Sequence, residues 1–167
     1  MVIWHILITF IVVVVLAIVI NGIEEYGSKN SLTKLSFADS MGRLNLPIIT
    51  LTNNGQTFNF LVDTGATISV VDSVVLDKIE HTKLNTVGEA YGIDGNIVKV
   101  NYVSIELAKE DMTFTEQFQV MRLDAFDNLR ETDNLELSGI LGSAFLKAHG
   151  FVIDFEKLTL CTKEVQK

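Results

Sequence analysis

The sequence has very few of the residues that build metal centres and disulfide frameworks. It contains one cysteine, Cys161, and three histidines, His5, His81 and His149, which are scattered along the chain. A single thiol forms no intrachain disulfide, and these residues lack the spacing of a metal site. We therefore expect no metal ion and no other cofactor in the chemistry of this protein.

Basic residues are also scarce. Among 167 residues there are 13 lysines and arginines against 21 aspartates and glutamates, which gives a formal net charge of −8 at pH 7. The basic residues form no cluster that would neutralise a row of phosphates. We therefore expect no nucleic acid as a partner.

Residues 1–20 contain no lysine, arginine, aspartate or glutamate. The apolar run Val2–Ile20 supplies about 19 residues, which is enough to cross the core of a bilayer. We predict that residues 1–21 form a single-pass transmembrane anchor, which enters the membrane through residues 2–20. A cleavable signal peptide is the alternative, but its apolar core is typically shorter and follows basic residues, which this run lacks.

The orientation of the predicted anchor depends on two lysines. Lys29 and Lys34 follow the apolar run, and no basic residue precedes it. Basic residues on one flank nominally favour the cytoplasmic side for that flank. Two residues do not decide the matter, so the side of the membrane stays open.

Two further regions follow the apolar run. Residues 22–43 are rich in polar residues and glycine, and we predict a tether with a possible first strand. Residues 44–167 are predicted to form the folded domain. It begins with a hairpin in which Asn53-Asn54-Gly55 connects strands over 46–52 and 56–63.

The central feature of the domain is a lone carboxylate between two apolar runs. The run Asn59–Val62 leads into Asp63-Thr64-Gly65-Ala66, and a second run, Thr67–Val71, follows. A charge in a tight loop between two strands is costly unless it is paired or used in chemistry. Gly65 allows a positive φ angle or the close approach of another chain, and the Thr64 hydroxyl can lock the loop by a hydrogen bond. An ordinary turn between strands contains the same residue types and is the alternative interpretation.

Strands and turns are predicted for the next part of the domain. Asp72 is a candidate N-cap for a helix over residues 73–80. Alternating apolar residues predict strands over 98–107 and 112–122. The acidic segment 124–136 lacks the residue order of a calcium-binding loop, so we predict a solvated surface loop.

A second motif, Ser138–Leu146, places a glycine directly after an apolar strand. Gly142 is predicted to lie where two strands cross and no side chain fits. A helix over 143–149 should follow and end at Gly150. Two short strands, over 151–155 and 158–161, then form a closing hairpin.

The two motifs together resemble the retropepsin-like (retroviral-type) aspartic protease family. The matching residues are Leu61-Val62-Asp63-Thr64-Gly65-Ala66 and Ile140-Leu141-Gly142, and the order of elements agrees over roughly residues 44–161. The resemblance implies a mainly β, single-lobe acid protease fold with closed, barrel-like sheets and one or two short helices. It also implies that the strand before Gly142 passes beside the Asp63 loop in a psi-shaped crossing.

The resemblance also implies which residues form the site. Asp63, Thr64 and Gly65 would be catalytic. A glycine-rich hairpin lies where the family has its flap, the hairpin that closes over bound peptide, and an ordinary surface hairpin is the alternative. The substrate-binding residues implied in this way are Ala66, Tyr91, Gly92, Ile93, Asp94 and Gly95.

Aspartic proteases need two carboxylates that share one proton beside one water molecule. This sequence has one Asp-Thr-Gly loop, so the resemblance implies a homodimer in which each subunit supplies Asp63 at a two-fold axis. We expect a membrane-anchored aspartic endopeptidase that acts on a peptide or protein substrate. The alternative is a non-catalytic module that keeps the fold for dimerisation or peptide binding.

Overall fold

The computed structural model describes residues 34–91 and 97–162, and most of them lie in β-strands. The predicted membrane anchor, the first part of the predicted tether and the hairpin tip Gly92–Gly95 lie outside the described residues. No helix within the two described ranges is long and apolar enough to cross a membrane.

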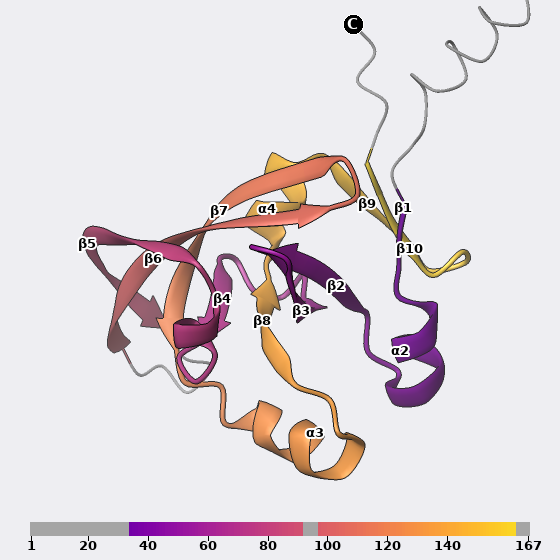
Figure 1. Cartoon of the computed structure of the whole chain (residues 1–167), viewed down its shortest axis with the longest axis horizontal. Coiled ribbons are helices and arrows are strands. Elements are labelled where there is room, and N and C mark those ends of the chain that lie inside the picture. The colour runs from indigo at the N-terminus through magenta and orange to yellow at the C-terminus, as the bar shows by residue number, and fades with distance from the viewer. Residues whose placement is uncertain (1–33, 92–96, 163–167) are drawn as a thin grey trace, which may run out of the picture. The chain divides into compact units, whose positions relative to one another are not determined.

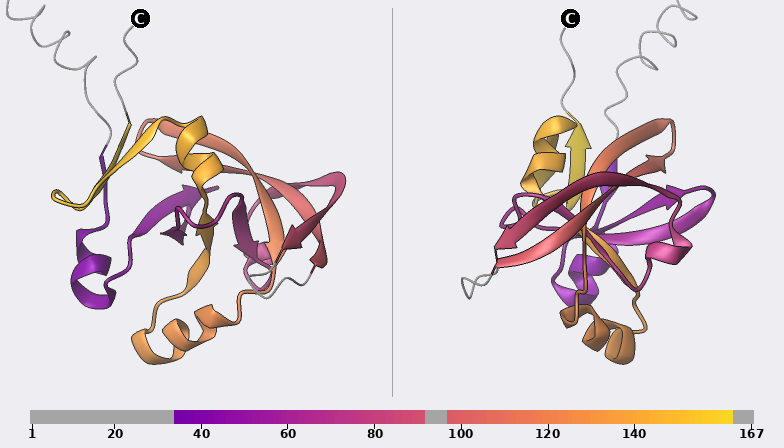
Figure 2. Two further views of the ribbon diagram at one scale, coloured as in Figure 1. Left: turned by 180° about the vertical axis from the view of Figure 1, so that it is seen from behind. Right: turned by 90° about the vertical axis from the view of Figure 1, so that its left-hand side faces the viewer.

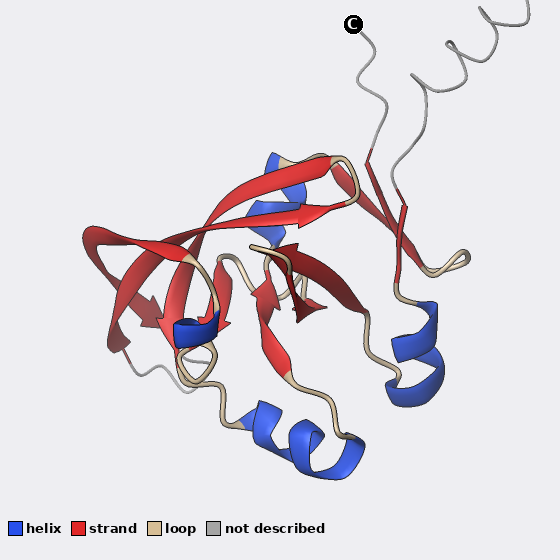
Figure 3. Ribbon diagram, viewed as in Figure 1, coloured by secondary structure: helices blue, strands red, loops and turns tan. Residues whose placement is uncertain are grey.

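Short helices separate groups of one to three successive strands along these residues (Figure 1, Figure 3). The strands are β1 (Lys34–Ser36), β2 (Ile48–Asn53), β3 (Gln56–Val62), β4 (Ser69–Asp72), β5 (His81–Tyr91), β6 (Ile97–Lys109), β7 (Met112–Met121), β8 (Leu137–Leu141), β9 (Phe151–Asp154) and β10 (Thr159–Thr162). The helices are α2 (Ala38–Leu44), the 3-10 helix η1 (Leu76–Lys78), α3 (Ala125–Asp133) and α4 (Ser143–Ala148).

Six strands close into a barrel in the order β2-β3-β8-β4-β7-β6, and β6 returns to β2. The closing contact pairs Thr52 with Ala108, and the Thr52 hydroxyl donates a hydrogen bond to the Ala108 carbonyl at 3.0 Å. The buried Asn53 amide strengthens this seam by donating to the Glu106 carbonyl at 2.8 Å. Strand β5 pairs with β6 outside the closed ring. The predicted mainly β fold with closed sheets is confirmed.

Strand β8 lies between β3 and β4, the two strands that flank the Asp63 loop (Figure 1). It runs parallel to β3, where Val62 pairs with Leu141, and antiparallel to β4, where Val70 pairs with Ile140. The psi-shaped crossing implied by the resemblance is therefore present. Both motifs meet at this point.

A second sheet contains the first and last strands of the described chain, in the order β1-β10-β9. Figure 2 shows the yellow β9–β10 hairpin beside the indigo β1. Leu35 of β1 pairs with Leu160 of β10, and both side chains are buried. The predicted closing hairpin and the possible first strand are both present.

Large apolar side chains fill the interior of the barrel. On β3, every second side chain is buried, namely Phe58, Phe60 and Val62. The ring of Phe60 packs against Phe118 of β7, with 5.9 Å between the ring centroids. Burial of each such ring contributes about 1.5–3 kcal/mol to folding. The Asp63 loop therefore leaves from a strand that the core holds in place.

The prediction of a solvated loop over 124–136 is wrong, because this segment contains helix α3. Phe126 and Leu129 lie three residues apart on one face of the helix and pack in an apolar cluster with Leu137 of β8. This apolar contact outweighs the acidic composition of the segment.

Two predictions for the other helices are also wrong. The helix over 73–80 is reduced to η1, and Asp72 belongs to β4 instead of capping a helix. Helix α2 occupies 38–44, so all of it except Leu44 lies in the predicted tether. Its Ser40 hydroxyl accepts a hydrogen bond from the Ile48 amide at 3.1 Å, which fixes the helix to the start of β2. The described residues thus contain three α-helices rather than one or two.

Candidate active site

Asp63 follows β3 directly, and the backbone holds its loop at two points. The Asp63 amide donates to the Leu141 carbonyl of β8 at 3.1 Å, and the Ala66 amide donates to the Asp63 carbonyl at 3.3 Å. The Gly65 amide also donates to the Asp63 carboxylate, at Oδ1, over 2.8 Å. Asp63 is half-buried, whereas Thr64 and Gly65 are exposed. The loop therefore presents its carboxylate close to the surface of the chain, in an orientation fixed by its own backbone.

The start of α4 and the last residue before it hold the other half of the loop. The Ser143 amide and hydroxyl both donate to the Ala66 carbonyl, at 2.8 and 3.1 Å. The Ala144 amide donates to the Thr67 carbonyl at 3.1 Å, and the Gly142 amide donates to the buried Ser69 hydroxyl at 3.2 Å. These bonds join the Asp-Thr-Gly motif to the Gly142 motif, so the two form a single structural unit.

Two glycines make the crossing possible. A Cβ atom at Gly142 would lie 2.8 Å from the Ala66 oxygen and from the Ile68 carbonyl carbon, which confirms the prediction that no side chain fits there. A Cβ at Gly139 would be closer still, 2.2 Å from the Val70 carbonyl oxygen. Sequence reasoning missed Gly139. A glycine inside an apolar strand was the signal that could have revealed it.

Gly65 does not have the positive φ angle that sequence reasoning allowed, since the described glycines with positive φ are Gly55 and Gly150. The heavy atom nearest to a Cβ at Gly65 would be Oδ1 of Asp63, at 3.1 Å. Within one chain, this glycine therefore leaves room for the carboxylate and donates a hydrogen bond to it. The close approach of a second chain at Gly65 stays a prediction.

The Thr64 hydroxyl makes no hydrogen bond to any residue of the described ranges. It does not lock the loop within one subunit, as sequence reasoning allowed. Thr64 is exposed next to Asp63. Its hydroxyl is thus accessible to a partner from outside the chain.

The hairpin expected to act as a flap is present as far as it is described. Strands β5 and β6 pair up to Tyr91 and Ile97, on either side of the tip. The remaining tip residues predicted to bind substrate, Gly92, Ile93, Asp94 and Gly95, lie outside the described residues. Substrate contacts of Tyr91 and of these four residues stay predictions.

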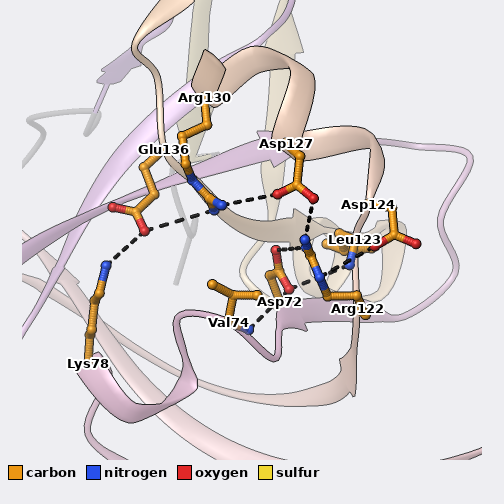
Figure 4. A network of polar contacts seen from close by, with 9 residues as sticks. All are labelled: Asp72, Val74, Lys78, Arg122, Leu123, Asp124, Asp127, Arg130 and Glu136. Carbon is orange, nitrogen blue, oxygen red and sulfur yellow. Dashed lines mark hydrogen bonds and ion pairs between the residues drawn. The ribbon is translucent and has the colours of Figure 1, made fainter.

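A buried carboxylate at the far end of β4 supports the strand that leaves the loop (Figure 4). Asp72 is 0% exposed and forms an ion pair with Arg122, Nη1 to Oδ2, at 3.1 Å. Its Oδ1 also accepts hydrogen bonds from the amides of Val74 at 3.2 Å and Leu123 at 3.5 Å. Several hydrogen bonds to one carboxylate offset the cost of burying its charge. Asp72 thus ties the end of β4 to the chain that follows β7.

The same network continues onto α3. Arg122 also forms an ion pair with Asp127 of α3, and Arg130 donates to Asp127 at 3.0 Å. Lys78 pairs with Glu136 at 2.9 Å, just before β8. Sequence reasoning missed this network, since the contacts that join its parts, Asp72 with Arg122 and Lys78 with Glu136, link residues that lie far apart in the chain. The one local signal was Asp72 at the end of the apolar run Ile68–Val71.

A comparison with known protein families gives a match over the part of the chain that contains this site. The family model described as Aspartyl protease matches residues 49–145, which is more than half of the chain. The matched range contains the Asp63 loop, the β5–β6 hairpin and the crossing at Gly142. No curated protein sequence matches the chain.

Proposed function

We propose that this chain, which belongs to the aspartyl protease family, is an endopeptidase that acts as a homodimer. Its two catalytic carboxylates are the Asp63 side chains of the two subunits. The Asp63 loop carries this proposal. It presents one half-buried carboxylate, and the neighbouring Thr64 and Gly65 are exposed. A second copy of the same loop, related by a two-fold axis, supplies the second carboxylate that the reaction needs.

The chemistry follows from the proximity of two like charges. Two carboxylates a few ångströms apart do not both ionise, so one holds a proton and the other is charged. The charged carboxylate takes a proton from a water molecule as it attacks the peptide carbonyl, and the protonated one supplies a proton to the leaving nitrogen. The pair titrates as a unit across both subunits.

The substrate in this proposal is an extended peptide. It lies between the Asp63 loops and the β5–β6 hairpins, and it adds backbone hydrogen bonds as a further strand would. The exposed Thr64 hydroxyl braces the paired loops. Residues 2–20 hold each subunit in a membrane, and confinement to one surface raises the effective concentration of one subunit for the other. The side of the membrane is left open.

The decisive experiment compares the parent chain with Asp63→Asn. The full-length chain, kept in mild detergent, is incubated with a library of short peptides at a series of pH values between about pH 3 and pH 8, a range that contains the upper titration step of such a carboxylate pair. Mass spectrometry should detect cleavage by the parent chain and by the control variant Asp39→Asn, whose exchanged side chain is exposed on α2. Asp63→Asn should cut nothing. Cleavage by Asp63→Asn at the parent rate would contradict the proposal.

A further inference from the structure

A pocket of about 580 Å³ lies beside the Asp63 loop. Its walls include Ile68, Gly88 of β5, Tyr102 of β6, Glu116 and Gln117 of β7, and Ala144 at the start of α4. Ile68 lies five residues after Asp63 in the same connecting segment and is 36% exposed. The Ala144 amide is bonded to the carbonyl of Thr67, the residue before Ile68. The backbone that holds the catalytic loop thus also forms one wall of the pocket.

The opposite wall is fixed by the packing of Tyr102. A Cβ at Gly88 would lie 2.5 Å from the Tyr102 ring, so the ring lies directly against the backbone of β5. The Tyr102 hydroxyl accepts a hydrogen bond at 2.9 Å from the side-chain amide of the buried Gln119. A wall held in this way is formed before any ligand arrives, as is usual for binding pockets.

Glu116 is the unusual residue of this pocket. On β7 it points to the same face as Phe114 and Phe118, which are both buried, and its own side chain is only 14% exposed. Burial raises the pKa of Glu116, although a hydrogen bond from the Gln117 backbone opposes the shift. A carboxylate at an inward position is costly to the fold unless a cation or hydrogen-bond donors reach it.

Within the described residues, no lysine or arginine forms an ion pair with Glu116. No lysine or arginine is among the described residues that line the pocket. His149 lies close to it: its Nε2 is 3.8 Å from Glu116 Oε2 and makes no hydrogen bond to any residue that the structure describes. Burial lowers the pKa of His149, whose ring packs against Phe114 and Phe145 at centroid distances of 5.0 and 4.7 Å. The imidazole therefore tends to be neutral and leaves the carboxylate without a fixed counter-charge.

We propose that this pocket binds a lysine or arginine side chain of the peptide substrate and that Glu116 is the residue that selects it. Ile68, Tyr102 and Ala144 supply apolar contact for the aliphatic stem, and Glu116 supplies the charge for the cationic end. An apolar side chain of the same length would leave the carboxylate buried without a partner. The assignment rests on the proposed function, because it takes the ligand to be the peptide that crosses the Asp63 loop.

The test measures binding separately from cleavage. Full-length chain carrying Asp63→Asn, in mild detergent, is titrated with pairs of fluorescent short peptides that differ only by lysine or norleucine at one position, with every position scanned in turn. At one position, lysine should bind about ten-fold more tightly than norleucine, the usual gain from one charged hydrogen bond. Adding Glu116→Gln should abolish that preference, and Glu116→Lys should transfer it to peptides with glutamate at the same position.

Two further variants make the comparison specific. Glu131→Gln removes the same charge from an exposed position on α3 and should leave the lysine preference intact. Gln117→Lys places a cation at an exposed position of the pocket rim without changing Glu116, and it should also abolish the preference. Agreement between Gln117→Lys and Glu116→Gln would show that the effect comes from pocket charge and not from misfolding of one variant.

The outcomes separate this inference from the proposed function. Equal binding of lysine and norleucine peptides at every position, or a preference that survives Glu116→Gln, would overturn the pocket assignment even if the parent chain cleaves peptides. A Glu116-dependent preference in a chain that cleaves nothing would support the pocket and contradict the proposed function. Binding of none of the peptides would overturn the assignment together with the peptide-binding part of the proposed function.

Discussion

A Cβ atom at Gly139 would lie 2.2 Å from the Val70 oxygen, so an alanine there forces β8 and β4 apart. We expect Gly139→Ala to lower the free energy of unfolding by at least about 2 kcal/mol, because backbone atoms cannot give way as a flexible side chain can. Gly42→Ala in α2 is the matched control, since nothing lies within 4 Å of its added Cβ. It should be neutral or stabilising by up to about 1 kcal/mol. Urea unfolding midpoints measure both, and a parent-like midpoint for Gly139→Ala would mean that the strands do not cross this closely.

Glu116 should make the stability of the fold depend on pH. Its pKa is raised above the ordinary value of 4.5, so the folded state holds its proton more strongly than the unfolded state does. The resulting stability is fully present below pH 4.5 and is lost as the pH rises through the raised folded pKa. Glu116→Gln, which stays neutral, should match the parent at low pH. It should become the more stable protein towards neutral pH, by less than about 1 kcal/mol because the carboxylate keeps some contact with water.

Thermal melts of the parent and of Glu116→Gln at a series of pH values measure this difference. His149 contributes with the opposite sign, because its pKa is lowered from 6.5 and stability is lost as the pH falls from there. Well above pH 6.5 the imidazole is neutral in the folded and the unfolded state, so its contribution is the same in both proteins; below that pH its 3.8 Å contact with Glu116 makes the contribution differ between them. Glu131→Gln on α3 again serves as the exposed control. A constant difference between Glu116→Gln and the parent from acidic to neutral pH would contradict the assigned burial of Glu116.

At the scale of elements, the Asp72 carboxylate joins β4 to the end of β7 and, through Arg122, to α3. We expect Asp72→Asn to destabilise the protein by about 2–3 kcal/mol, since a buried charged hydrogen bond is lost while Arg122 remains. Asp39→Asn removes the same charge from an exposed pair with Arg43, 3.7 Å apart, and should change stability by no more than about 0.5 kcal/mol. Unfolding midpoints in urea compare the two. Equal effects of the two exchanges would show that the Asp72 network is no stronger than a surface ion pair.

The strands were largely predictable from the sequence because their signals are local. The turn Asn54-Gly55 indicated the β2–β3 hairpin, and both residues have the positive φ angles that this turn requires. Helix α4 was predictable in the same way, over 143–149, but α2 and α3 were not. Helix α3 is stabilised by contacts with Arg122 and Leu137 outside it, and α2 buries none of its own side chains. The amino-acid composition of the two segments does not indicate which contacts they make with the rest of the chain.

The residues of the candidate site also differ in whether local sequence signals were enough to predict them. Asp63 and Gly142 belong to contiguous motifs, so the sequence identified them and the structure places them together. Gly139, Asp72 and Glu116 matter because of neighbours that are distant in sequence, namely Val70, Arg122 and His149. The pairing of strands β4, β7 and β8 brings the first two pairs of partners together, and the end of α4 supplies His149. Their roles therefore required the arrangement of strands as well as the motifs.

At the scale of the whole molecule, the formal charge of −8 affects how two copies would meet. Two acidic subunits repel each other, and salt screens this repulsion over distances of about 10 Å at 0.1 M. The proposed dimer should therefore be weaker at low ionic strength. Any measurement of its assembly needs more than one salt concentration.

Dependence on a shared site is the sharpest prediction for the whole molecule. Each chain presents one Asp63, so the specific activity of the full-length chain in detergent should fall when it is diluted below the dissociation constant of the dimer. Mixing parent and Asp63→Asn chains in equal amounts at constant total concentration should reduce activity to about a quarter, because only dimers of two parent subunits keep both carboxylates. Independent subunits would instead retain about half. Undiminished specific activity from a species that sedimentation shows to be monomeric would contradict a site shared between subunits.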